Sequence, residues 1–221
     1  MYLGAGYFAR QIDFSKSDVK GVVEELKAYV PDAGISQVRA WRDSVMILKA
    51  ASDDFLTQKP PGVDTSSIIL EYTVPLESRR IDTILILSGV VVVIEFKGKD
   101  KPSQADIDQA AAYARDLRAY HKMCTDVPVI CLLVLTGYRG DPVRRSEVDL
   151  VSPDYLLSSC IKSIRAGENT LNVDEFLKFE CYQPQPTLIK AARELFESGS
   201  LTRIHRAAVA TGPTLDLCTN I

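Results

Sequence analysis

The alternation of apolar and polar residues along the chain predicts helices first and a sheet afterwards. Apolar residues recur at helical spacing over about residues 18–29, which Pro31 ends, and again over about residues 37–51. The second stretch contains Trp41, the only tryptophan of the chain. We expect two helices before the first strand, with Trp41 packed in the interior.

Three segments rich in β-branched residues follow, and their composition predicts strands. They cover about residues 67–74, 80–87 and 90–97. Only Ser88 and Gly89 separate the second segment from the third, a spacing typical of a tight β-hairpin. We expect Leu87 to pair with Val90 across this turn.

A helix, a buried strand and further helices complete the pattern. Ser103 and Asp106 form a candidate capping box for a helix over about residues 104–121. The continuous apolar run over about residues 127–135 predicts a buried strand. Two more helices are expected, over about residues 153–166 and after the proline-rich residues 184–186. The order ααβββαβα predicts an α/β fold with a mixed central sheet flanked by helices.

Composition supports a single globular domain, alone or with a helical appendage. The chain has 221 residues, of which 46% are hydrophobic and 25% charged. No apolar run is long enough to span a bilayer, and the first residues lack a secretory signal, so we expect no membrane partner and a cytoplasmic location. The five cysteines are scattered, which argues against a disulfide framework or a zinc site.

The chemistry of the chain gathers on the predicted hairpin. In the register that pairs Leu87 with Val90, Asp82 lies directly opposite Glu95, and the two carboxylates share a face. Lys97 follows two residues after Glu95 and therefore lies on that face, with Arg80 opposite it.

Two carboxylates on a buried surface repel each other unless a cation lies between them. Oxygen ligands favour Mg²⁺ or Mn²⁺ as this cofactor, with Asp82 and Glu95 as its ligands. Lys97 would then position water or offset charge on a phosphate. The alternative is a structural salt-bridge cluster at the end of a strand.

A third acidic ligand is expected near this pair. Glu71, in the preceding strand, is the first candidate, and the alternatives on the early helices are Glu24, Glu25 and Asp43. The loop between the first two strands leaves the register of Glu71 against Asp82 open.

The helix after the hairpin adds two candidate site residues. Gln109 and Tyr113 are one turn apart and therefore lie on one face. Placed beside Lys97, Gln109 could bind a metal-bound water or a phosphate, and Tyr113 could contact a nucleic-acid backbone. The alternative is that both side chains are ordinary contacts between helix and sheet.

Local basic residues must attract any nucleic acid, because the net charge of the chain is −3. The candidates flank the hairpin on both sides. They are Arg79, Arg80, Lys99 and Lys101.

These residues resemble the signature of a known nuclease superfamily. Arg80-Ile81-Asp82 followed by Glu95-Phe96-Lys97 is similar to the D…(D/E)-x-K motif of the PD-(D/E)xK nucleases, and Gln109 with Tyr113 matches the Q-x-x-x-Y motif of their RecB-like branch. The resemblance implies a restriction-endonuclease-like αβββαβ core and metal-dependent cleavage of DNA or RNA. Asp82 and Glu95 would be metal ligands, and Lys97 would be the catalytic lysine.

A second resemblance covers nearly the whole chain. Segments around Ala40-Trp41, Leu70-Glu71-Tyr72 and Tyr182-Gln183-Pro184 are similar to the N-terminal region of bacterial Schlafen-like DNA/RNA helicases. No phosphate-binding G-x-x-x-x-G-K-[ST] motif occurs. We therefore expect the N-terminal part of a nuclease-helicase used in phage defence.

In that interpretation residues 1–181 form the nuclease domain, and residues 182–221 form a helical linker toward the helicase domain. The expected partners are that helicase domain and nucleic acid, with DNA favoured over RNA. The alternative function is a catalytically silent nuclease-fold domain that binds nucleic acid or docks a partner. The sequence sets no expectation for the oligomeric state.

Overall fold

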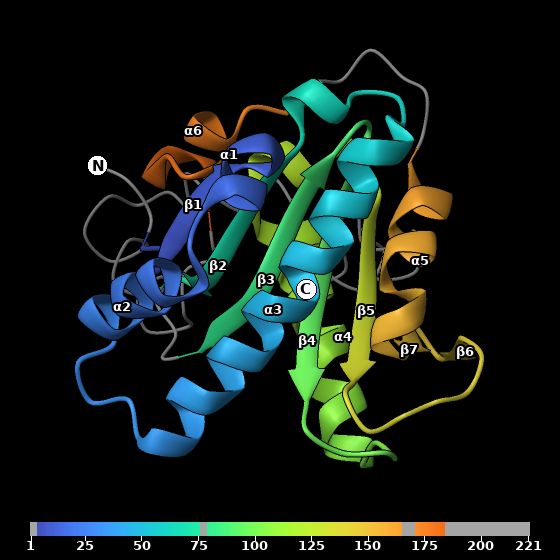
Figure 1. Cartoon of the computed structure of the whole chain (residues 1–221). Coiled ribbons are helices and arrows are strands. Elements are labelled where there is room, and N and C mark those ends of the chain that lie inside the picture. The colour runs from blue at the N-terminus through green and yellow to red at the C-terminus, as the bar shows by residue number, and fades with distance from the viewer. Residues whose placement is uncertain (1–3, 76–78, 165–170, 184–221) are drawn as a thin grey trace, which may run out of the picture. The chain divides into compact units, whose positions relative to one another are not determined.

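A computed structural model describes residues 4–75, 79–164 and 171–183. The chain divides into two compact units, Met1–Tyr182 and Gln183–Ile221. The first unit is an α/β domain built on one mixed sheet of seven strands, so the predicted fold class is confirmed (Figure 1). The helix predicted after residue 186 lies outside the described residues, as does the predicted linker beyond Gln183.

The sheet combines antiparallel and parallel neighbours. Its strands are β1 (Tyr7–Arg10), β2 (Ser67–Thr73), β3 (Arg80–Leu87), β4 (Val90–Lys97), β5 (Val129–Leu135), β6 (Val143–Arg145) and β7 (Val148–Val151). Their order across the sheet is β1-β2-β3-β4-β5-β7-β6. Neighbours from β1 to β4 are antiparallel, β4, β5 and β7 are parallel, and β6 is antiparallel to β7.

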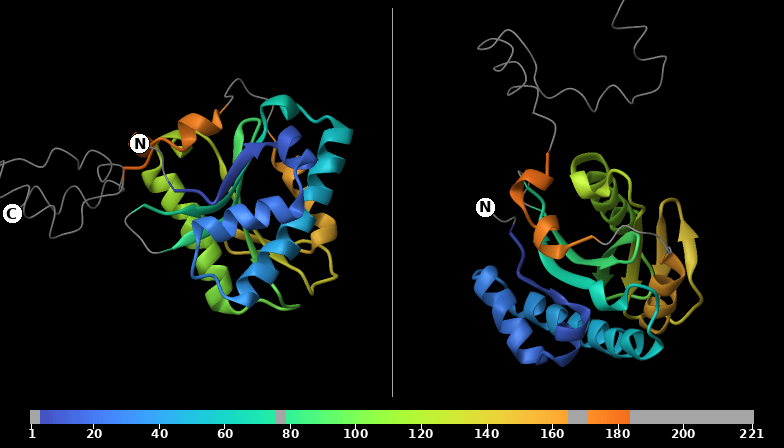
Figure 2. Two further views of the ribbon diagram at one scale, coloured as in Figure 1. Left: turned by 60° about the vertical axis from the view of Figure 1, so that its left-hand side comes forward. Right: turned by 90° about the horizontal axis from the view of Figure 1, so that it is seen from above.

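Helices cover both faces of this sheet. They are α1 (Gln11–Lys16), α2 (Val19–Tyr29), α3 (Ile35–Gln58), α4 (Gln104–Tyr120), α5 (Leu156–Ser163) and α6 (Val173–Phe176). Side chains of α1, α2, α3 and α5 pack against one face, and those of α4 and α6 pack against the other. The view from above in Figure 2 shows the sheet as a layer between α4 and the blue helices α1 to α3. None of the helices in the described part of the chain is long and apolar enough to cross a membrane.

The hairpin of β3 and β4 has the predicted register. Leu87 pairs with Val90, and the pairing continues inward to Thr83 with Ile94. Gly89 in the turn has a φ of +65°, in the left-handed region that glycine adopts without strain. The first six residues of β4 are buried, as expected for a strand with helices on both faces.

Some predicted boundaries were wrong. Helix α3 continues to Gln58 rather than ending near residue 51, because Phe55 extends the apolar face and no helix-breaking residue precedes Lys59. The helix α2 begins after Asp18, whose side chain caps it by accepting the N–H of Gly21 at 3.0 Å.

Five short elements were not predicted: β1, α1, β6, β7 and α6. Each is eight residues or shorter, and the three strands among them form by pairing with a neighbour. A window of four residues is too short for its own apolar spacing to identify it.

The predicted capping box of α4 is confirmed. The Ser103 hydroxyl accepts the N–H of Asp106, and the Asp106 carboxylate accepts both the N–H and the hydroxyl of Ser103 at 2.7 Å. Lys99 also donates to this carboxylate at 2.6 Å. The start of α4 is thereby tied to the loop that follows β4, and this bond fixes the helix beside the end of that strand.

We predict that Asp106→Asn lowers the free energy of unfolding at pH 7 by about 1–2 kcal/mol, because hydrogen bonds to a charged group contribute more than neutral ones. Burial by itself would raise the pKa of Asp106, but the bonds from Lys99 and Ser103 outweigh it and lower the pKa to about 2. The stabilisation is therefore complete above about pH 4 and is lost as the pH falls toward the folded-state pKa.

Urea unfolding at a series of pH values from neutral to acid measures this effect. The exposed neighbour Asp108, which bonds only to Gln104 in the described residues, provides the matched control Asp108→Asn. A stability difference between wild type and Asp106→Asn that stays constant down to acid pH would contradict the prediction.

Candidate active site

The backbone pairing between β3 and β4 ends just before Asp82. Thr83 and Ile94 form the last pair of the ladder. Oδ2 of Asp82 accepts the N–H of Phe96 at 2.9 Å, so a side-chain carboxylate takes the place of a backbone acceptor. The two strands separate here, and β4 pairs on with β5 alone as far as Lys97.

The pairing of β2 with β3 is interrupted beside the same position. Glu71 and Asp82 face each other in the register without forming a backbone pair. Glu71 has a φ of +51°, which is unusual for a residue other than glycine. This geometry answers the question that the sequence left open: Glu71 lies against Asp82.

The interruption also changes which face each residue occupies. Strict alternation along β3 would place Ile81 on the face opposite to Ile84, but both belong to the core cluster on the α4 side. Alternation fails here because it holds only along an uninterrupted strand.

Lys97 connects the end of β4 with α4. Its Nζ donates to Oε1 of Glu95 at 3.0 Å and to Oε1 of Gln109 at 3.1 Å. The amide of Gln109 in turn donates to the hydroxyl of Tyr113 at 3.0 Å. The structure thus joins four of the predicted site residues in one hydrogen-bonded chain.

Only one of the two carboxylate oxygens of Glu95 has a hydrogen-bond partner among the described residues. Its side chain is 2% exposed, and Lys97 binds Oε1. Oε2 is buried and has no hydrogen-bond partner within the described residues. Burying a carboxylate oxygen without a hydrogen bond costs free energy. This atom is therefore a candidate contact for a ligand or a cation.

The pKa values of Asp82 and Glu95 are both raised, which also indicates that their negative charges are incompletely compensated. Burial raises the pKa of Asp82 well above its usual value, and the neighbouring carboxyls of Glu95 and Glu71 raise it further. Burial also raises the pKa of Glu95, although Lys97 opposes this shift. The pair is therefore short of positive charge.

Lys97 keeps its proton in this environment. Burial alone would lower the pKa of Lys97, but the carboxylates of Glu95 and Asp82 outweigh it, and the net pKa is raised. Lys97 is thus a cation and a hydrogen-bond donor rather than a base.

Glu71 has partners for both of its oxygens. Oε1 accepts the indole N–H of Trp41 at 2.8 Å, and Oε2 accepts Nε–H of Arg80 at 2.9 Å. Trp41 lies on α3, and its ring is 5% exposed. The third acid is therefore present beside the pair but is held by a helix and an arginine.

The three acids line one cavity of about 170 Å³. Its opposite wall is α3, which contributes Trp41 and the polar side chains of Gln37 and Ser44. Glu24, Glu25 and Asp43, the alternative third ligands, are exposed and do not line this cavity.

Tyr113 occupies a different position from the one expected. Its side chain is 2% exposed, within the core cluster on the α4 side. The guanidinium of Arg79 lies over its ring, 5.4 Å from the centroid. Tyr113 thus holds Gln109 in place instead of presenting its hydroxyl at the surface.

Three of the four predicted nucleic-acid-binding residues are ion-paired with acids of the chain. Arg79 pairs with Asp116 at 2.8 Å, Lys99 with Asp106 at 2.6 Å, and Arg80 with Glu71. Arg80 does not lie in a paired position opposite Lys97, as predicted, because the β3–β4 ladder has already ended. Lys101 is exposed.

The residues of this site fit a hard divalent cation in part. In favour are the partnerless Oε2 of Glu95, the adjoining carboxylate of Asp82, and a donor set of oxygens, which suits Mg²⁺ or Mn²⁺. Against it, residues 4–75, 79–164 and 171–183 contain no group of three or more His, Cys, Asp or Glu side chains arranged to hold a metal ion. Glu71, the third acid that lines the cavity, is bound by Trp41 and Arg80.

Sequence reasoning missed the contribution of α3. Trp41 was expected to serve packing alone, but it is also a hydrogen-bond donor to a site carboxylate. The contact spans 30 residues and depends on how α3 lies across the sheet, which no local pattern encodes.

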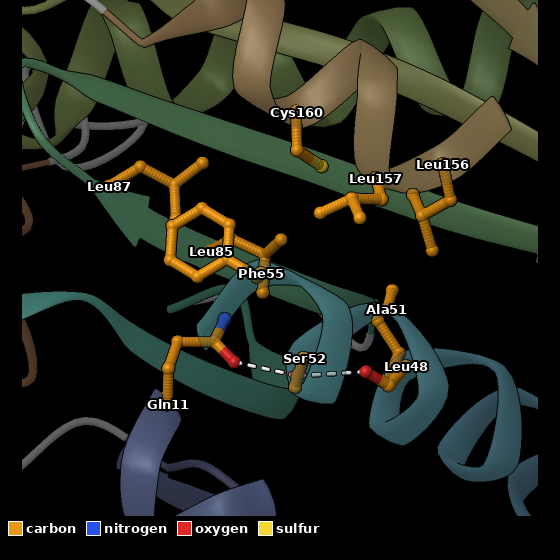
Figure 3. A pocket seen from close by; sticks show the side chains of 10 residues that line it. All are labelled: Gln11, Leu48, Ala51, Ser52, Phe55, Leu85, Leu87, Leu156, Leu157 and Cys160. Atoms are coloured by element: carbon orange, nitrogen blue, oxygen red, sulfur yellow. Dashed lines mark hydrogen bonds between the residues drawn. The ribbon is translucent and has the colours of Figure 1, made fainter. Parts of the chain in front are cut away.

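A second, much smaller cavity lies on the same side of the sheet between α3 and α5 (Figure 3). It holds about 20 Å³, enough for one water molecule. Ser52 donates to Oε1 of Gln11 at 2.7 Å at its edge. Burial raises the pKa of the lining Cys160 thiol to about 12, so the thiol stays protonated. This cavity is a packing feature of the core.

Comparisons with known proteins add no assignment. No family model, no curated protein and no solved structure matches the chain.

We predict that Trp41 and Glu71 are energetically coupled in the metal-free protein. Trp41→Phe leaves Oε1 of the buried Glu71 without its donor, and Glu71→Gln removes the charge that makes the bond strong. A double-mutant cycle should give an interaction energy of about 1–2 kcal/mol.

The cycle is measured by urea unfolding in the presence of a chelator. Circular dichroism is the signal, because variants that carry Trp41→Phe have no tryptophan fluorescence. Additive effects of the two substitutions, within about 0.3 kcal/mol, would show that the bond contributes nothing to stability.

Proposed function

We propose that this domain is a divalent-metal-dependent phosphodiesterase that cleaves nucleic acid. The observation that carries the proposal is the buried Oε2 of Glu95, which has no hydrogen-bond partner among the described residues and lies beside the carboxyl of Asp82. Lys97 compensates the negative charge of these two acids only in part, and a bound cation would supply the rest.

Asp82 and Glu95 would hold Mg²⁺ or Mn²⁺ through the oxygens that face the cavity. The ion, when bound, polarises a phosphoryl oxygen and lowers the pKa of water. Lys97, held in place by Gln109 and kept protonated by Glu95, donates to the phosphate oxygens on which charge accumulates during cleavage. Tyr113 fixes the orientation of Gln109.

Nucleic acid is the substrate class that fits these groups. Nucleic acid carries one negative charge per nucleotide, and two cationic side chains lie beside the acids of the cavity: Lys97 bonds to Glu95, and Arg80 bonds to Glu71. The resemblance of Asp82 and Glu95-Phe96-Lys97 to the PD-(D/E)xK motif supports the same chemistry. Four expectations from the sequence remain predictions. They are DNA as the preferred substrate, the helicase domain as partner, the cytoplasmic location and the role in phage defence.

We predict that the purified protein with Mn²⁺ cleaves DNA or RNA and that Lys97→Ala lowers the rate at least about 100-fold, the typical cost of losing one group that stabilises the transition-state charge. Glu95→Gln, which keeps the shape of the side chain, should reduce the rate to a similar extent. Cleavage of labelled single- and double-stranded oligonucleotides, with and without a chelator, measures both.

Lys162→Ala, at an exposed position of α5, is the matched control for loss of a lysine and should cleave at the wild-type rate. Thermal unfolding of every variant separates loss of the site from loss of the fold. Metal-dependent cleavage that survives both Lys97→Ala and Glu95→Gln would refute the assignment of this site.

One observation favours a second candidate function, a catalytically silent domain that binds nucleic acid or a partner. No three-acid metal group is assembled within the described residues. Salt-dependent binding of an oligonucleotide in chelator, without cleavage under Mg²⁺ or Mn²⁺, would support this function over the first.

A further inference from the structure

Glu71, next to the candidate ligands, combines a strained backbone conformation with a buried carboxylate. Its backbone has a φ of +51° in the middle of β2, a conformation that costs energy for a residue with a side chain. Its carboxylate is buried and is bound by Trp41 on one oxygen and by Arg80 on the other. Strain of this kind persists only where the surroundings enforce it, and it is concentrated at sites that change state.

Arg80 is the more exchangeable of these two partners. Its side chain is 33% exposed, whereas that of Glu71 is 6% exposed. Among the described residues, Arg80 makes one side-chain hydrogen bond, through Nε, and its terminal nitrogens bond to none of them. A guanidinium binds a phosphate through two parallel bonds, a stronger arrangement than one bond to a carboxylate.

Glu71 lies where a third metal ligand would be needed. It faces Asp82 across the β2–β3 register and lines the same cavity as Asp82 and Glu95. Its charge acts on both of these carboxyls. Without Arg80, the buried carboxylate of Glu71 would keep Trp41 as its one donor among the described residues. A nearby cation would then compensate the charge of this carboxylate.

We propose that Arg80 couples substrate binding to assembly of the metal site: a phosphodiester takes the guanidinium of Arg80, and Glu71 is released to join Asp82 and Glu95 as the third ligand. This inference rests on the proposed function, because it requires metal binding at Asp82 and Glu95. It assigns Arg80 as a positioning residue and Glu71 as a ligand only when substrate is present.

Thermodynamic linkage makes the coupling measurable from either side. If a phosphodiester promotes release of Glu71, it strengthens metal binding, and the metal strengthens phosphodiester binding by the same factor. Typical coupling between two sites changes affinity by about 5–150-fold. The single tryptophan reports on the change, because the indole of Trp41 is bonded to the carboxylate that moves.

The test measures the Kd of Ca²⁺, which takes oxygen ligands, by calorimetry and by Trp41 emission, with and without the dinucleotide dTpdT as phosphodiester probe. In the wild type the probe should tighten Ca²⁺ binding at least about 5-fold. Arg80→Gln should bind Ca²⁺ about that much more tightly without the probe, and the probe should then have no further effect. Glu71→Gln should bind Ca²⁺ as the wild type does without the probe, and the probe should not tighten it.

Arg10→Gln is the matched control, because it removes another arginine–acid pair, Arg10 with Asp13 at 2.9 Å, outside the cavity. It should keep the wild-type coupling. Thermal unfolding verifies that each variant is folded.

The outcomes separate this inference from the proposed function. Ca²⁺ binding that Asp82→Asn and Glu95→Gln abolish, together with an unchanged Kd and unchanged coupling in Arg80→Gln, would overturn the inference alone. Absence of any Ca²⁺ or Mn²⁺ binding that depends on Asp82 and Glu95 would overturn both.

Discussion

The site depends on one electrostatic constraint: the carboxyls of the half-buried Asp82 and the buried Glu95 lie together with less positive charge than they require. Burial raises the pKa of both groups, and the charge of Glu95 raises the pKa of Asp82 further. One oxygen of Glu95 has no partner among the described residues. Lys97 supplies part of the compensation through a 3.0 Å bond. Such an arrangement lowers the stability of the protein, so it persists only where the surrounding fold contributes enough free energy to offset it.

The fold supplies that stability on both sides of the site. β4 is buried between the helices of the two faces, and it pairs with β3 up to Ile94 and with β5 up to Lys97. The separation of β3 from β4 then opens the sheet where the acids lie. Helix α4 is fixed by its capping box and brings Gln109 to Lys97, while α3 brings Trp41 to Glu71 on the other side. Each acid is thus positioned by a different element of the α/β scaffold.

Features encoded by neighbouring residues could be predicted from the sequence. The two-residue turn at Ser88-Gly89 sets the hairpin register, and the period of the strand brings Glu95 and Lys97 to one place. The capping box of α4 is likewise a local signal. The contact of Trp41 with Glu71 and the loss of alternation at Asp82 could not be predicted in this way. Both arise from the packing of distant segments, and the pairing of Lys99 with Asp106 depends on the path of the loop that follows β4.

The central claim is that a divalent cation completes the Asp82–Glu95 pair. Anomalous diffraction from crystals soaked in Mn²⁺ tests it most directly. We expect one ion within about 2.0–2.3 Å of a carboxylate oxygen from each of Asp82 and Glu95, the range for oxygen ligands of small divalent cations. Crystals saturated with Mn²⁺ that show no ion between these two side chains would contradict it.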